Sequence, residues 1–121
     1  MLNCIIVGLG GFVGAVLRYL IGLVPIKNPD AFPINTFIIN IAGAFAIGCI
    51  ALVATKNTDI DPKVLLFLKV GICGGFTTFS TFSLETAELI KSGSVVTAVI
   101  YVILSIVIGV LAVMLPQLVF K

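Results

Sequence analysis

The sequence predicts an all-α membrane protein with four transmembrane helices. Of its 121 residues, 60% are hydrophobic and 10% are charged, and the mean hydropathy is +1.32. A water-soluble domain of this size exposes too much of its surface to be so apolar. The apolar runs are long enough to cross a bilayer core of about 30 Å, which takes about 20 helical residues. Residues 1–121 therefore predict a single transmembrane domain.

The four predicted spans are Leu2–Val24, Pro33–Ala54, Val64–Ile90 and Ser94–Val119. The first lacks the positively charged segment that opens a signal peptide, so we expect it to be retained as a helix. Short segments, "PIKNPDAF", "TKNTDIDPK" and "KSG", separate the spans, and their Pro, Asn, Asp and Gly residues favour turns. Four crossings predict that both termini lie on one side of the membrane.

The positive charges of the chain are nearly balanced between the two sides. The terminal side is predicted to carry Lys56, Lys63, Lys69 and Lys121, and the opposite side Arg18, Lys27 and Lys91. A bias of four against three gives only a weak orientation signal under the positive-inside rule. Insertion in both orientations, and hence an antiparallel homodimer, is therefore open to this chain.

Composition excludes several classes of function. The net charge of +2 excludes a polybasic surface for nucleic acid or anionic lipid. The chain has no histidine, and Cys4, Cys49 and Cys73 lie at unrelated spacings, so a zinc site is not expected. We expect these cysteines to be small core residues. The run "GLGGFVG" lies within a span and does not predict a dinucleotide loop, and no motif indicates an enzyme.

Small residues recur four positions apart in three of the spans. The pairs are Gly10 and Gly14, Ala44 and Gly48, and Gly71 and Gly75. Because lipid provides no hydrophobic drive for helix association, such pairs allow backbones to approach closely. They predict the contact faces of the bundle.

The third span contains the unusual stretch "GGFTTFSTF" at residues 74–82. Gly74 and Gly75 each weaken a helix by about 1 kcal/mol relative to alanine, and the hydroxyls that follow can bond to the backbone in non-helical arrangements. The stretch predicts a helix broken near the centre of the span, where freed carbonyl and amide groups form ion sites. The alternative is a kinked packing face that carries hydroxyls.

Several side chains in the spans are candidates for an anion path. Phe76, Phe79 and Phe82 share a drifting helical face and are either core residues or rings whose electropositive edges face an anion. Asn40, in an uncharged span, either joins helices or donates hydrogen bonds to an anion. Tyr101 and Ser105, one turn apart, extend a polar track.

Ionisable side chains lie near the span ends. Arg18 either snorkels to the membrane surface or raises the anion concentration in a vestibule. Glu85 and Glu88, near the end of the third span, are expected at the membrane interface.

The stretches "GGFVGAVLRY", "NTFIINIAGAFAIG" and "GICGGFTTFSTFSLE" together resemble the Fluc (CrcB) family of fluoride channels, and the resemblance covers essentially the whole chain. It implies an antiparallel, dual-topology homodimer with two pores and a central, structural sodium ion. The backbone carbonyls of Gly74 and Thr77 would hold this ion, which is not transported.

The resemblance also implies pore residues. These are Asn40, Phe79 and Phe82, with the hydroxyls of Ser80, Thr81, Tyr101 and Ser105 as the polar track. Beyond Ser105 the next turns present Gly109 and Val113, so the track is expected to be short. The implied function is passive export of cytoplasmic fluoride through the plasma membrane, with fluoride, lipid and a second copy of the chain as partners.

Two other functions fit four short spans. A small dual-topology, proton-coupled multidrug exporter would need a carboxylate deep in the membrane, and the first two spans have none. A non-transporting membrane scaffold would explain the glycines, but it would not explain the combination of Asn40 with the phenylalanine and hydroxyl pattern.

Overall fold

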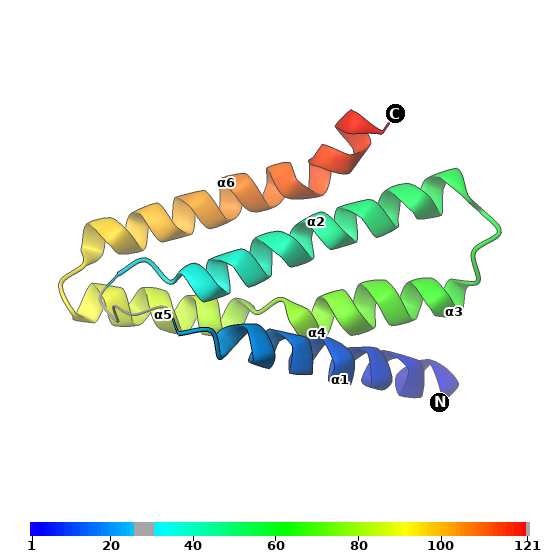
Figure 1. Ribbon diagram of the computed structural model, residues 1–121, viewed down its shortest axis with the longest axis horizontal. Coiled ribbons are helices and arrows are strands. Elements are labelled where there is room, and N and C mark those ends of the chain that lie inside the picture. The colour runs from blue at the N-terminus through cyan, green and yellow to red at the C-terminus, as the bar shows by residue number, and fades with distance from the viewer. Residues whose placement is uncertain (26–30, 121) are drawn as a thin grey trace.

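The computed structural model describes residues 1–25 and 31–120. Within these ranges four helical segments are long and apolar enough to cross a membrane, as predicted: α1 (Leu2–Gly22), α2 (Ile34–Lys56), the composite segment Pro62–Lys91, and α6 (Val95–Val119). Their ends differ from the predicted spans by at most two residues. The segments alternate in direction, and both termini lie at one end of the bundle (Figure 1). We call this the terminal end, and the opposite end the loop end.

The third segment consists of four consecutive elements. These are α3 (Pro62–Leu65), the π-helix η1 (Leu66–Cys73), α4 (Gly74–Phe76) and α5 (Phe79–Lys91). Between α4 and α5 the backbone is extended at Thr77 (φ −80°, ψ 157°) and Thr78 (φ −146°, ψ 117°), where the ribbon narrows (Figure 1). Thr78 caps α5, because its Oγ1 accepts a hydrogen bond from the Thr81 amide at 3.1 Å.

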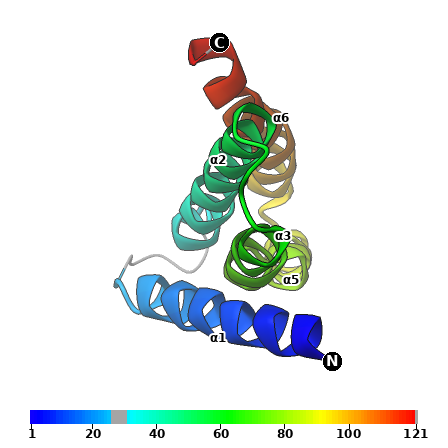
Figure 2. The same cartoon turned by 90° about the vertical axis from the view of Figure 1, so that its right-hand side faces the viewer.

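The helices pack as two pairs, α1 along the third segment and α2 along α6 (Figure 2). A Cβ added at Gly10 would lie 2.6 Å from the Phe67 carbonyl oxygen, and one at Gly14 would overlap the Ile72 carbonyl oxygen. Gly48 of α2 contacts the Val113 backbone of α6 equally closely. The predicted glycine faces are therefore backbone contact surfaces, as lipid-embedded packing requires.

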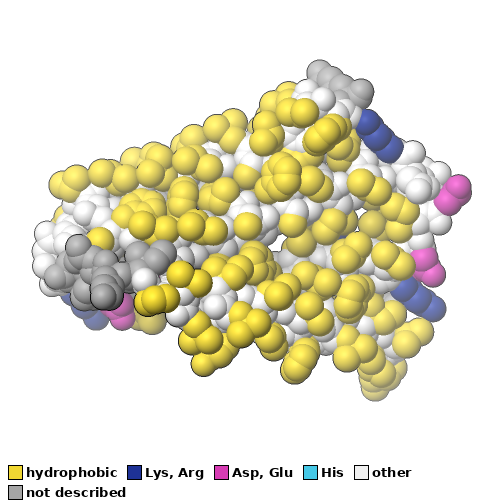
Figure 3. All heavy atoms as spheres, in the orientation of Figure 1, with side chains coloured by type: hydrophobic (Ala, Val, Ile, Leu, Met, Phe, Trp, Pro, Cys, Tyr) yellow, Lys and Arg dark blue, Asp and Glu magenta, His cyan; other side chains and the backbone are white. Residues whose placement is uncertain are grey.

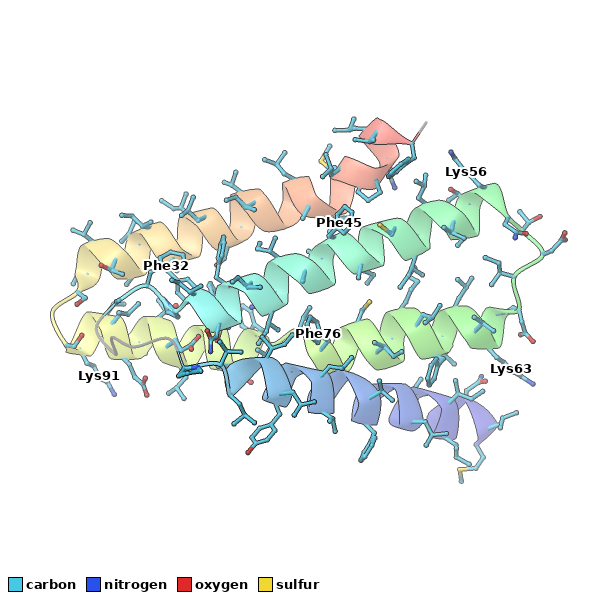
Figure 4. All side chains as sticks on the ribbon, viewed as in Figure 1. Phe32, Phe45, Lys56, Lys63, Phe76 and Lys91 are labelled. Atoms are coloured by element: carbon cyan, nitrogen blue, oxygen red, sulfur yellow. The ribbon has the colours of Figure 1, made fainter. Side chains whose placement is uncertain are left out.

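The exterior fits a protein surrounded by lipid. Apolar side chains cover the visible face, and the charged side chains in view lie at its two ends (Figure 3). Lys56 and Lys63 lie at the terminal end and Lys91 at the loop end (Figure 4), whereas Lys27 and Lys121 fall outside the described residues.

The cysteines depart in part from the prediction. Cys73 is buried and Cys49 is half-buried, but Cys4 is exposed, so the expectation of a core position is wrong for Cys4. Cys4 precedes Gly10 by six residues, which places it on a different side of α1 from the face that packs against the third segment.

Candidate functional site

Asn40 of α2 holds the extended residues of the third segment. Its Oδ1 accepts a hydrogen bond from the Thr78 amide at 2.8 Å, and its Nδ2 donates to the Thr78 carbonyl at 3.2 Å. Gly43, buried on the same helix, is covered by the side chains of Thr77 and Phe76. One side-chain amide thus satisfies both polar backbone groups of Thr78, which have no helical partner.

Arg18 of α1 reaches the same region from the other side. Its Nε donates to the Gly75 carbonyl at 3.3 Å. Both the amide and the Oγ1 of Thr77 donate to the Cys73 carbonyl, at 3.1 and 3.0 Å. In the described part of the chain, the carbonyls of Gly74 and Thr77 accept no hydrogen bond. These two carbonyl oxygens retain full capacity for another ligand.

A pocket of about 290 Å³ lies beside these extended residues. We call it the central pocket, and its lining residues are Asn40, Thr77, Thr78, Phe79, Phe82, Ser105 and Ile106. The Ser105 Oγ is buried and has no hydrogen-bond partner among the described residues. The Phe79 and Phe82 ring centroids lie 5.9 Å apart, and the Phe79 side chain is 79% exposed in the single chain.

A second pocket, of about 310 Å³, has most of its lining residues between the extended residues and the loop end. We call it the loop-end pocket, and it is lined by Arg18, Tyr19, Gly22, Leu23, Asn35, Thr36, Ile39, Thr78, Thr81 and Glu85. It shares Thr78 with the central pocket, so the two pockets adjoin at the extended residues. A basic and an acidic side chain, Arg18 and Glu85, both line it.

Glu85 is the centre of a buried polar group that sequence reasoning missed. Its two carboxylate oxygens each accept a hydrogen bond at 2.9 Å, one from Thr36 Oγ1 and one from the Tyr101 hydroxyl. Tyr101 is fully buried and packs against Phe82, with ring centroids 5.0 Å apart. Glu88 is exposed and Glu85 is half-buried, and the interfacial position expected for both stays a prediction. In the sequence, Thr36 lies one turn before Asn40 on α2, and this hydroxyl was the signal that could have indicated a polar contact at this level of the bundle.

The structure therefore gathers most of the predicted site residues. Asn40, Thr77, Phe79, Phe82 and Ser105 line the central pocket, and Arg18 and Thr81 line the loop-end pocket. Three others line neither of these two pockets.

Those three have different surroundings. Ser80 is exposed, with its Oγ 3.4 Å from Thr78 Oγ1. Tyr101 is bonded to Glu85. Gly74 is exposed, and the atom nearest to an added Cβ would be the Lys69 carbonyl oxygen, at 3.9 Å.

Comparisons with known proteins give a consistent result. The profile of the family described as "CrcB-like protein, Camphor Resistance (CrcB)" matches residues 5–117. The chain is 47% identical over 122 residues to the "Fluoride-specific ion channel FluC" of Ruminiclostridium cellulolyticum, covering 100% of this chain and 94% of that protein. It is 40% identical over 111 residues to the protein of the same name from Azobacteroides pseudotrichonymphae, covering 91% and 89%. For the protein of that name from Clostridium perfringens the identity is 43% over 118 residues, covering 97% and 92%.

This family consists of channels, not enzymes, so the exporter and scaffold alternatives are set aside. The four apolar helices and the similarity to these channels identify a multi-pass protein of the plasma membrane. The chain belongs to the FluC (CrcB) family of fluoride channels.

Proposed function

We propose that this protein is a fluoride-selective channel that passively exports cytoplasmic fluoride and thereby lowers its toxicity. The observation that carries the proposal is the central pocket, where an amide, a hydroxyl without a partner and two phenylalanine rings meet. Its lining residues carry no ionisable side chain, so a small anion would meet hydrogen-bond donors and ring edges and no fixed cation.

The donors must replace water. Moving even a carboxylate-sized ion into a dry medium costs about 20 kcal/mol in the idealised case, and the hydration energy of a smaller anion is larger. Asn40 Nδ2 carries a second hydrogen beyond the one given to Thr78, and Ser105 Oγ has its own hydrogen to donate. Ring edges of Phe79 and Phe82 add weak positive potential. Weak, distributed binding permits exit, as conduction requires.

We assign the remaining polar residues to the approaches of this pocket. Arg18 and Thr81 belong to a vestibule formed by the loop-end pocket. We assign Ser80, Tyr101 and Ser105 to the polar track; the Tyr101 hydroxyl donates to Glu85, which lines the loop-end pocket.

The functional unit in this proposal is an antiparallel, dual-topology homodimer with two pores. The 79% exposure of Phe79, a lining residue, leaves its ring uncovered in one chain, so a second copy would complete the pocket wall. The near balance of positive charge between the two ends is compatible with insertion in both orientations.

The extended pair Thr77–Thr78 would act as the functional break of the third helix and hold a structural sodium ion. The fit rests on the carbonyls of Gly74 and Thr77, which accept no hydrogen bond in the described chain. Two such oxygens from each of two copies would give four neutral ligands suited to a hard cation. When bound, the ion would fix the break and add positive potential near the anion path.

Ion flux from liposomes that contain the purified protein tests the proposal. Fluoride efflux should be rapid, should stop when the fluoride gradient has dissipated, and should require neither a proton gradient nor a nucleotide. Chloride efflux under the same conditions should match that of protein-free liposomes. Fluoride efflux no faster than in protein-free liposomes, or equal chloride and fluoride rates, would refute the proposal.

A further inference from the structure

Lys69 is a basic residue inside the third membrane-crossing segment, and the proposed pathway leaves it unused. It lies in η1, seven residues after Pro62, and is half-buried. An ammonium group within a membrane segment is costly unless it reaches water, a polar cavity or a partner. Such a residue therefore calls for a function.

The packing of the third segment defines the side on which Lys69 lies. Gly71 and Gly75 approach the backbone of α1 at Gly10 and Gly11. Lys69 precedes Gly71 by two residues and so lies away from this contact.

The same reasoning relates Lys69 to the central pocket. Lys69 lies in the same π-helix as the buried Cys73, and both the amide and the Oγ1 of Thr77 donate to the Cys73 carbonyl, so the three residues follow one another along the segment toward the pocket. Thr77 lines the central pocket and Lys69 precedes Thr77 by eight residues, so along the third segment Lys69 lies between this pocket and the terminal end.

The charge of Lys69 is not neutralised within the described chain. No carboxylate in residues 1–25 or 31–120 forms an ion pair with its ammonium group. The acidic residues of the neighbouring loop, Asp59 and Asp61, are exposed, and Asp61 Oδ1 accepts from the Lys63 amide. The four-carbon stem of lysine allows the ammonium group to extend along the helix surface toward water.

We propose that Lys69 supplies positive potential at the terminal mouth of the anion path, as the counterpart of Arg18 at the loop-end pocket. The inference rests on the proposed fluoride-channel function. A lysine near a mouth raises the local concentration of a small, hydrated monovalent anion without binding it tightly. In an antiparallel dimer the terminal end of one protomer lies at the same membrane surface as the loop end of the other. Each surface would then present one lysine and one arginine.

The test compares Lys69→Gln with the wild type in liposomes of neutral lipid, at constant sodium, at ionic strengths of about 0.01 M and about 1 M. The Debye length falls from about 30 Å to about 3 Å between these conditions. We expect Lys69→Gln to lower initial fluoride flux about three- to tenfold at low ionic strength, and less than about twofold at high ionic strength. Lys69→Arg should retain wild-type flux.

Lys63→Gln is the matched control, because Lys63 is exposed at the same end, in the first turn of the third segment. Its effect should be much smaller at both ionic strengths. Equal flux for Lys69→Gln and wild type at low ionic strength would overturn the inference, as would a reduction that is the same in both salts. A reduction seen only in vesicles of anionic lipid would instead mark Lys69 as a headgroup anchor. Wild-type protein without fluoride flux would refute the proposed function itself.

Discussion

Asn40 pairs with the backbone of Thr78 and also lines the central pocket, and the chemistry of its side-chain amide explains both. A side-chain amide has both an acceptor and a donor, so it can pair with the amide and the carbonyl of Thr78 in the way a neighbouring strand would. One amide hydrogen remains for the central pocket. Only glutamine carries the same neutral amide, and its side chain is one methylene longer.

Asn40→Asp should abolish conduction. The carboxylate keeps the bond from the Thr78 amide but loses the donor, and it places a negative charge in the anion path. Two like charges about 4 Å apart repel by about 4 kcal/mol at the effective dielectric of a protein surface, so flux should fall at least about a hundredfold. Efflux measurements on protein whose dimeric state is verified by gel filtration would check this. Normal flux would remove Asn40 from the path.

The two pocket phenylalanines are expected to act through their edges. Phe79→Ile and Phe82→Ile keep apolar bulk but remove the ring quadrupole, whose interactions are worth about 0.5–1.5 kcal/mol. Each change should lower fluoride flux by about tenfold or less per ring while the fold persists. Phe12→Ile is the control, because Phe12 is 69% exposed on α1 and lines neither pocket. If both pocket variants conducted like this control, the rings would be packing residues.

At the scale of the element, the third segment joins a tightly packed half to a polar interruption. Its first half packs against α1 through glycines, and its second half begins with a capped helix at Thr78. At the junction of the two halves, the carbonyls of Gly74 and Thr77 accept no hydrogen bond among the described residues.

The proposed sodium ligands are backbone carbonyls, so the sodium dependence of flux and dimer stability should respond to changes that disturb the backbone and not to changes of the ligand residues' side chains. Thr77→Ser keeps the backbone carbonyl and the hydroxyl bond to Cys73, so sodium-dependent dimer stability should be unchanged. A Cβ at Gly74 meets only the Lys69 carbonyl, at 3.9 Å within one chain, so crowding by Gly74→Val would arise from a second copy. We expect that variant to lose sodium-dependent flux. Full flux and dimer stability of the wild type after exhaustive sodium removal would contradict the sodium site.

The contact between α1 and the third segment makes a separate prediction about stability. Gly14→Leu should destabilise the fold by about 1–3 kcal/mol, because its side chain would displace the backbone at Ile72. Gly8→Ala is the control, since nothing lies within 4 Å of an added Cβ there and alanine favours the helix. Unfolding in detergent, followed by circular dichroism, measures both. Equal stability of the two variants would contradict the packing argument.

Hydropathy and turn residues were sufficient to predict four helices and their ends within two residues, because membrane length constrains helices directly. The π-helical turns of η1 were not predictable, since no local signal distinguishes them from α-helix. Likewise the carboxylate of Glu85 is held by Thr36 and Tyr101, from two other helices. Such bonds depend on tertiary packing, which sequence spacing along one helix does not reveal. Cys4 was misplaced for the same reason.

At the scale of the whole molecule, two helix pairs meet at the extended residues. Asn40 belongs to the α2–α6 pair, and Arg18 to the pair formed by α1 and the third segment. The central pocket draws its lining from α2, the third segment and α6. The shape of this pocket thus depends on how the two helix pairs pack against each other.

Orientation in the membrane gives the last prediction. Thr58→Lys combined with Asp59→Lys, in the loop between α2 and α3, should bias insertion toward one orientation and lower flux at least severalfold, because antiparallel pairs become rare. Co-expression with a variant that carries two added lysines at the loop end should restore flux. A biased variant that conducts fully on its own would contradict dual topology. Orientation is measured by labelling single cysteines from each side of the membrane.

The spacing along α1 also limits how the gene can change. Gly10, Gly14 and Arg18 follow at intervals of four, and each makes a contact with the third segment that tolerates little displacement. Inserting or deleting one residue between Gly14 and Arg18 would turn the arginine by about 100° around the helix, away from the Gly75 carbonyl. Length in this part of the chain is therefore constrained as strictly as residue identity. Insertions in descendants of this sequence should accumulate in the connecting loops and be purged from the first helix.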